Sequence, residues 1–210
     1  QLLHEVLHFD RDNAEVRAIL GHIKKDDHWH VTSDSFRWRT SKIDHPTLPL
    51  EKGQYYKAVT PHFEIDSTAD ENRTRHLANQ LERAHAVWRQ VFFDYWGSKK
   101  KLKECLAGKT KFRTPSRKFK VVFFRNKQEY AAVMAPLVRG IEKSSGYYSI
   151  KRRISFFYDG DTLAEKTWRH ELTHQLFRES RGRVPENAFH NNYIWLDEGV
   201  ASYFESLADH

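Results

Sequence analysis

The chain has 210 residues, 39% of them hydrophobic, and its 35 Lys and Arg exceed its 28 Asp and Glu, which gives a formal charge of +7. This length suffices for one domain with a buried core and at most a small additional region. No apolar run approaches the length that spans a bilayer, and the single cysteine, Cys105, excludes an internal disulfide.

The net positive charge would suit an anionic partner such as nucleic acid or a membrane surface. Much of this charge, however, lies in two short runs at 98–103 and 113–118, between expected helices and strands. Such runs are typical of solvated loops. We therefore expect loops at both places, and we do not expect nucleic-acid binding.

The first 55 residues are expected to form an N-terminal helical and irregular region that ends in a linker. Apolar residues at three-to-four spacing predict two short helices, at 2–9 and 13–23. Residues 28–39 show no clear periodicity, and two prolines and a glycine between 46 and 53 are typical of a linker.

Residues 56–210 are expected to form the larger unit, an α+β domain. Sequence patterns predict a strand at 62–66, a helix from an N-cap near Asp70 to about 96, a strand at 119–125, a helix at 128–138 and a hairpin at 146–158. Helices at 163–179 and near 192–207 follow. The long helix carries an apolar core stripe, and we expect His76 and His85 on its surface.

The motif His-Glu-x-x-His occurs twice, at 4–8 and at 170–174. On a helix its two histidines lie one turn apart on the same face and can bind one zinc ion, with the glutamate beside them. The flanking residues separate the two copies. Leu176 and Phe177 give the second copy an apolar side for packing, whereas the first copy runs directly into a charged segment, Asp10-Arg11-Asp12. We expect a site only at the second copy.

A further motif follows at 195–205, with the sequence Trp-Leu-Asp-Glu-Gly-Val-Ala-Ser-Tyr-Phe-Glu, and its Glu198 comes 24 residues after His174 (198 − 174). The two motifs together resemble the gluzincin zinc metallopeptidases, whose second helix carries a similar Trp-Leu-x-Glu-Gly-x-Ala-x-Tyr-x-Glu segment. More closely, the chain resembles an uncharacterised bacterial group of peptidase-MA-like, gluzincin-like proteins known from planctomycetes. The resemblance covers about the last two thirds of the chain.

The resemblance implies a zincin-like α+β fold, in which a small mixed or antiparallel sheet packs on helices that include the zinc helix. It also implies one Zn²⁺ per chain, held by His170, His174 and Glu198 with one coordination position open. Glu171 would then act as general base in the hydrolysis of a peptide or protein substrate.

Several further roles follow from the same resemblance. Matched residue by residue, Glu205 would orient a ligand histidine, and Asp197 is a second candidate for that role. Ordinary salt bridges are the alternative for both acids. A group that stabilises the oxyanion is also expected, and Tyr147, Tyr148 and His190 are the nearby candidates.

The hairpin at 146–158 directly precedes the zinc helix. In gluzincins an edge strand lies along the cleft and pairs with extended substrate backbone, and the resemblance assigns that edge to this hairpin. An ordinary core hairpin is the alternative. Related enzymes continue past the glutamate helix, so the expected catalytic domain, 56–210, would be either truncated at its C-terminus or minimal.

A zinc-dependent peptidase is the function that the sequence favours. A gluzincin-like scaffold that binds metal without catalysis and a basic nucleic-acid-binding protein are the alternatives. Because peptidases of this kind frequently act outside the cytoplasm, an extracytoplasmic or secreted location is expected. The sequence indicates no oligomeric state.

Overall fold

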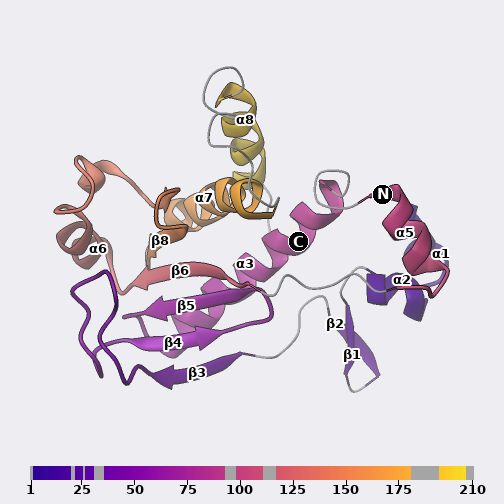
Figure 1. The fold of residues 1–210 in the computed structure, drawn as a ribbon, viewed down its shortest axis with the longest axis horizontal. Helices are drawn as coiled ribbons and strands as arrows, with labels where there is room; N and C mark the ends of the chain where they lie inside the picture. Colours follow the sequence, from indigo (N-terminus) through magenta and orange to yellow (C-terminus); the bar gives the residue numbers. More distant parts are fainter. Residues whose placement is uncertain are drawn as a thin grey trace.

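A six-stranded mixed sheet forms the centre of the protein, with helices on both of its faces (Figure 1). The computed structural model describes residues 2–19, 22–25, 27–30, 36–92, 98–110, 117–180 and 194–206. In spatial order the strands are β3 (Arg37–Thr40), β4 (Tyr56–Val59), β5 (Phe63–Ser67), β6 (Phe119–Phe124), β8 (Ile154–Tyr158) and β7 (Tyr147–Ser149). The β5–β6 and β6–β8 pairs are parallel and the other pairs antiparallel. The expected α+β architecture with a small mixed sheet is confirmed.

Alternation along β6 shows how the sheet divides two cores. Val121 and Phe123 belong to one apolar cluster, and Val122 and Phe124 belong to the other. The first cluster contains residues of α3 (Glu71–Val91), α7 (Thr162–Ser180) and α8 (Ile194–Glu205), and the second contains residues of the short helix α6 (Lys127–Met134) and of the 3-10 helix η1 (Ile141–Lys143). Because successive side chains point to opposite faces, a strand rich in apolar residues at every position is buried on both sides.

Helix α3 begins where the sequence predicts, since the side chain of Asp70 accepts a hydrogen bond from the backbone N–H of Arg73 at 2.9 Å. Its stripe of Leu77, Leu81, Ala84 and Trp88 is buried as expected. The expectation for His85 is wrong. This histidine is only 3% exposed, because it lies on the side of the helix that packs against β5 and the start of β6.

The N-terminal region departs from expectation after α1 (Leu2–Phe9), which is confirmed. Helix α2 (Ala14–Ile19) ends earlier than predicted, and a two-stranded hairpin of β1 (Ile23–Lys25) and β2 (His28–His30) follows it. Strand β3, in a segment without visible periodicity, pairs with β4 and belongs to the central sheet. The sheet therefore begins in the chain well before residue 56.

The predicted linker near 46–53 is also wrong, because this segment packs into the protein. Leu48, Leu50 and Tyr55 are buried in the second core cluster. The ring Nδ1 of His45 accepts the backbone N–H groups of Thr47 and Leu48, at 3.2 and 3.1 Å, and closes a tight turn around the prolines. Proline here serves a fixed turn rather than a flexible connection.

The first basic run, expected as a loop, is helical in the structure, where it forms α5 (Lys99–Leu106). Of the second run only residues 117 and 118 are described.

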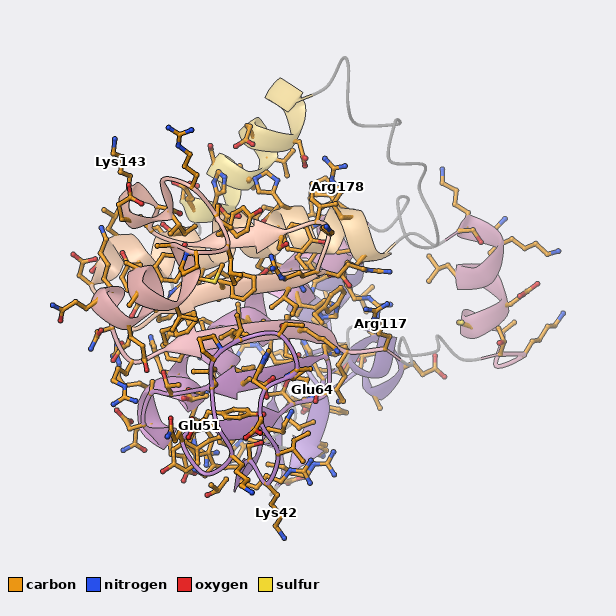
Figure 2. All side chains as sticks on the ribbon, turned by 60° about the vertical axis from the view of Figure 1, so that its left-hand side comes forward. Lys42, Glu51, Glu64, Arg117, Lys143 and Arg178 are labelled. Atoms are coloured by element: carbon orange, nitrogen blue, oxygen red, sulfur yellow. The ribbon has the colours of Figure 1, made fainter. Side chains whose placement is uncertain are left out.

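The labelled Lys42 and Lys143 project from opposite sides of the molecule in Figure 2, so these two charges do not share a face. None of the helices in the described ranges is long and apolar enough to cross a membrane.

Candidate metal centre

One side of helix α7 packs into the core, and another side carries the histidines of the expected zinc site. Trp168, Leu172 and Leu176 are spaced four residues apart and are fully buried in the first core cluster. His170 and His174, which lie one turn apart, therefore face away from that cluster and remain partly accessible, with side chains 17% and 14% exposed.

Helix α8 packs against α7 through Ala201 and Phe204, which are buried. Tyr203 on the same helix is 59% exposed. The ring of Phe204 lies next to that of Phe92, with ring centroids 6.1 Å apart. Glu198 lies on the side that faces α7.

The three expected ligands come together between the two helices. The Nε2 atoms of His170 and His174 are 3.1 Å apart, and the carboxylate oxygens of Glu198 lie 3.2 and 3.6 Å from them. One ligand atom from each residue fits within a group no wider than 4.8 Å. Ligands of tetrahedral zinc lie about 3.3 Å from one another. Two imidazoles and one carboxylate at this spacing fit zinc both in donor type and in distance.

A carboxylate approaches the second ring nitrogen of each ligand histidine. Oε1 of Glu205 is 2.6 Å from Nδ1 of His170, and Oδ2 of Asp197 is 3.5 Å from Nδ1 of His174. The Glu205 contact is an ion pair by distance, but its geometry is not that of an aligned hydrogen bond. Such acids fix the ring orientation of ligand histidines and raise their basicity.

Asp197 is further held by Arg178 of α7, which is labelled in Figure 2 and whose Nη2 lies 3.7 Å from Oδ2 of the acid. Burial lowers the pKa of His174, but Asp197, Glu171 and Glu198 raise it by more, so that this pKa lies above its ordinary value. The carboxylates thus favour a positive charge at this point. A divalent cation would meet the same demand and displace the proton.

Glu171 lies beside the ligands and is held by the sheet. Its Oε2 accepts a hydrogen bond of 2.8 Å from the backbone N–H of Tyr148 in β7. Burial raises the pKa of Glu171, while His174, this hydrogen bond and His170 oppose the rise. Within the described residues β7 is an end strand of the sheet, so the hairpin supplies an edge next to Glu171.

The two tyrosines expected as oxyanion donors make different contacts. The hydroxyl of Tyr148 donates to Oε1 of Glu179 at 3.3 Å, and burial together with Glu179 raises its pKa. The ring of Tyr147 stacks on Phe156 in the second core cluster. His190 lies outside the described residues. The Tyr148 hydroxyl is thus engaged with Glu179, whereas the oxyanion role expected of Tyr147 stays a prediction.

A polar network near the end of α7 was not anticipated from the sequence. Gln175 accepts from the hydroxyl of Ser155 at 2.9 Å and donates to Glu179 at 3.1 Å, and Glu179 also contacts Nε of Arg153 at 3.2 Å. These contacts tie the β7–β8 hairpin to the zinc-motif helix. The available signal was Gln175 itself, a polar residue at a core-facing position directly after His174.

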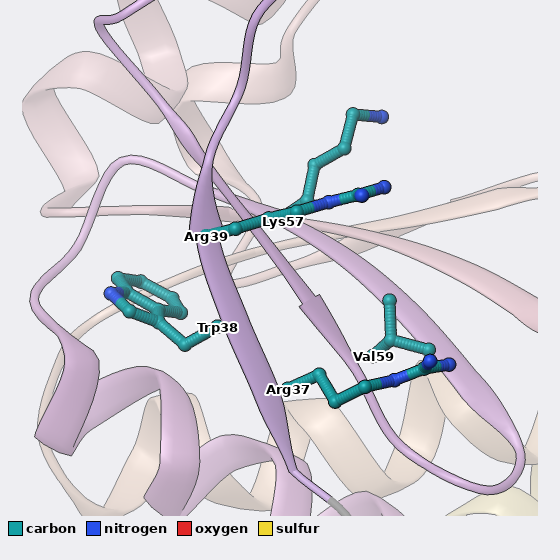
Figure 3. Close-up of a pocket in the computed structure, with 5 residues that line it drawn as sticks. All are labelled: Arg37, Trp38, Arg39, Lys57 and Val59. Carbon is teal, nitrogen blue, oxygen red and sulfur yellow. The ribbon is translucent and has the colours of Figure 1, made fainter.

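A separate shallow pocket lies at the opposite edge of the sheet (Figure 3). It is lined by residues of β3 and β4, namely Arg37, Trp38, Arg39, Lys57 and Val59. Nζ of Lys57 is 3.1 Å from Oδ1 of Asp66, so part of its positive charge is neutralised. Because β3 and β7 are opposite ends of the sheet, this pocket is distinct from the metal centre.

No protein-family model matches the chain, and a search of curated proteins found no match. The functional argument therefore depends on the residues of the site and on their geometry.

Proposed function

We propose that the protein is a zinc-dependent peptidase of the gluzincin type. The observation that carries this proposal is the convergence of His170, His174 and Glu198, with the carboxylate of Glu171 held beside them by the backbone of β7. Three protein ligands leave a fourth position for water or substrate, which distinguishes catalytic zinc sites from closed structural ones.

Zinc in this position would polarise a peptide carbonyl and lower the pKa of a bound water towards ~7. The residues of the chain supply the remaining functions. Glu171 would accept the proton of the attacking water and pass it to the leaving amine. Its burial raises its pKa, which suits a group that must take up and release a proton near neutral pH. Glu205 and Asp197 would hold the rings of His170 and His174 in the orientation that directs each Nε2 atom at the zinc position.

The proposed substrate is an extended peptide. Strand β7 is an end strand of the sheet, and it lies next to both α7 and Glu171. An end strand presents backbone groups that can pair with a peptide chain. The N–H of Tyr148 is already donated to Glu171, so a peptide would pair with other backbone groups of this strand. Side chains on a peptide bound in this way would alternate between the protein and solvent.

Metal content and hydrolysis measured on the same preparations test the proposal. His174→Ala and Glu198→Ala should each contain one equivalent of zinc less than the wild-type protein. Glu171→Gln should keep its zinc and lose hydrolysis of a peptide library. Equal zinc content in the wild type and both ligand variants would overturn the proposed ligand set.

A metal-binding scaffold without catalysis is the second candidate. The contact between the Tyr148 hydroxyl and Glu179 favours it, because that hydroxyl is then not directed at a reacting carbonyl. In this case His174→Ala and Glu198→Ala would still lose zinc, but the wild-type protein would hydrolyse no member of the peptide library.

A further inference from the structure

A second group of metal-binding side chains lies between the β4–β5 turn and α3. It comprises His62, directly before β5, and Glu82 and His85, one turn apart on α3. One ligand atom from each residue fits within 4.8 Å, the same limit that the α7–α8 centre meets. The donors are again two imidazoles and one carboxylate, but they come from different elements of the fold.

Glu82 is buried and its orientation is fixed. Its side chain is only 6% exposed. Oε1 accepts from the hydroxyl of Thr60 at 2.6 Å and from the backbone N–H of His62 at 2.9 Å. Oε2 lies 2.6 Å from Nδ1 of His62. Glu82 is thus oriented through Oε1, and an ion bound at Oε2 would replace the contact of this oxygen with His62.

The imidazole rings of His62 and His85 are in contact, and aromatic side chains lie next to them. Their ring centroids are 4.1 Å apart, and the ring of His85 also contacts those of Phe63 and Phe119, with centroids at 6.1 and 5.7 Å. Burial first, and then the nearby positive groups of His62 and Arg89, hold the pKa of His85 well below its usual range.

A buried carboxylate needs a positive partner, because leaving its charge uncompensated is costly. Lys118 is close, but its Nζ donates to the carbonyl oxygens of Thr60 and Pro61 in the same turn. A proton on His62 would compensate Glu82 only while placing a cation against the ring of His85. A divalent ion between the three side chains would compensate Glu82 and use both rings as ligands.

We propose that His62, Glu82 and His85 bind a second divalent metal ion, zinc by donor type, which fixes the β4–β5 turn to α3. The site is more deeply buried than the α7–α8 centre and is built from residues that the proposed reaction does not use. Three protein ligands alone do not separate this site from the α7–α8 centre, and we assign it a structural role because Glu82 and His85 are buried. The competing explanation is a metal-free hydrogen-bonded cluster in which Glu82 anchors the turn.

Metal stoichiometry after reconstitution with zinc and removal of the excess separates these explanations. The wild-type protein should contain two equivalents. His85→Phe, which keeps an aromatic ring between Phe63 and Phe119, should lose one of them and retain peptidase activity. The double variant H170A/H174A should lose the other. His76→Gln is the matched control, because His76 lies on the same helix and pairs with Glu165 at 3.0 Å.

A wild-type protein with one equivalent that His85→Phe retains, or two equivalents in His85→Phe, would overturn the proposal. Thermal unfolding provides a second readout that does not depend on activity. In the H170A/H174A background, a chelator should lower Tm, since metal that binds only the folded state stabilises it. Adding His85→Phe to that background should abolish the chelator effect. An unchanged chelator effect would assign the stabilising metal elsewhere.

Discussion

The α7–α8 centre (His170, His174, Glu198) and the cluster of His62, Glu82 and His85 contain the same three donor types in different surroundings. Glu198 has a side chain 54% exposed, whereas that of Glu82 is 6% exposed. At the first centre, carboxylates lie near the Nδ1 atoms of both histidines, and Glu171 lies beside them. At the second, a hydroxyl and a backbone N–H hold the carboxylate. In our proposal, the same ligand types serve catalysis at one cluster and structure at the other, because the two clusters differ in solvent access and in a neighbouring base.

Glu171→Gln should produce the largest effect and is the sharpest test of this contrast. Loss of the general base should reduce kcat by about 10²–10⁴-fold, because proton transfer in the transition state is lost. Zinc content and Tm should change little. Glu165→Gln on the same helix is the control and should retain nearly full activity. Wild-type kcat in Glu171→Gln would show that the two clusters do not differ in the proposed way.

Glu82→Ala should instead reduce stability. It leaves the buried Thr60 hydroxyl and the His62 N–H without their acceptor, which should cost about 3 kcal/mol in the free energy of unfolding. Urea unfolding measures this change. Glu64→Ala is the control, since the side chain of Glu64, labelled in Figure 2, is 40% exposed and should matter little. Equal effects of the two changes would mean that the buried cluster does not anchor the turn.

Glu205→Ala should weaken zinc binding at the first centre by about 10–100-fold, because it removes the carboxylate next to Nδ1 of His170. Asp197→Ala should have a smaller effect, since its distance to His174 is 3.5 Å rather than 2.6 Å. Competition with a chromophoric chelator measures both. The reverse order would show that distance in the metal-free protein does not rank these two acids.

The contrast also explains what could be predicted from the sequence. The α7–α8 ligands lie in short motifs whose helical spacing is enough to place His170 and His174 on one face. Glu82 and His62 are twenty residues apart (82 − 62) and meet only through the packing of α3 on the sheet. No local period records that contact, so His85 was expected on the surface. Strand β3 was missed for a related reason, because a four-residue end strand with one half-buried face has too little alternation to be recognised.

Tyr148→Phe should have the smallest effect on kcat. It tests whether strand β7, whose backbone holds Glu171, also stabilises the oxyanion. Its hydroxyl contacts Glu179, while its backbone N–H, which the substitution keeps, holds Glu171. Removing a true oxyanion donor costs about 10²–10³-fold in kcat. We expect a change well below that range, accompanied by a modest loss of stability from the Glu179 contact. A 10²-fold fall in kcat at unchanged KM and Tm would mean that the hydroxyl leaves Glu179 when substrate binds, and β7 would then supply both an orienting N–H and an oxyanion donor.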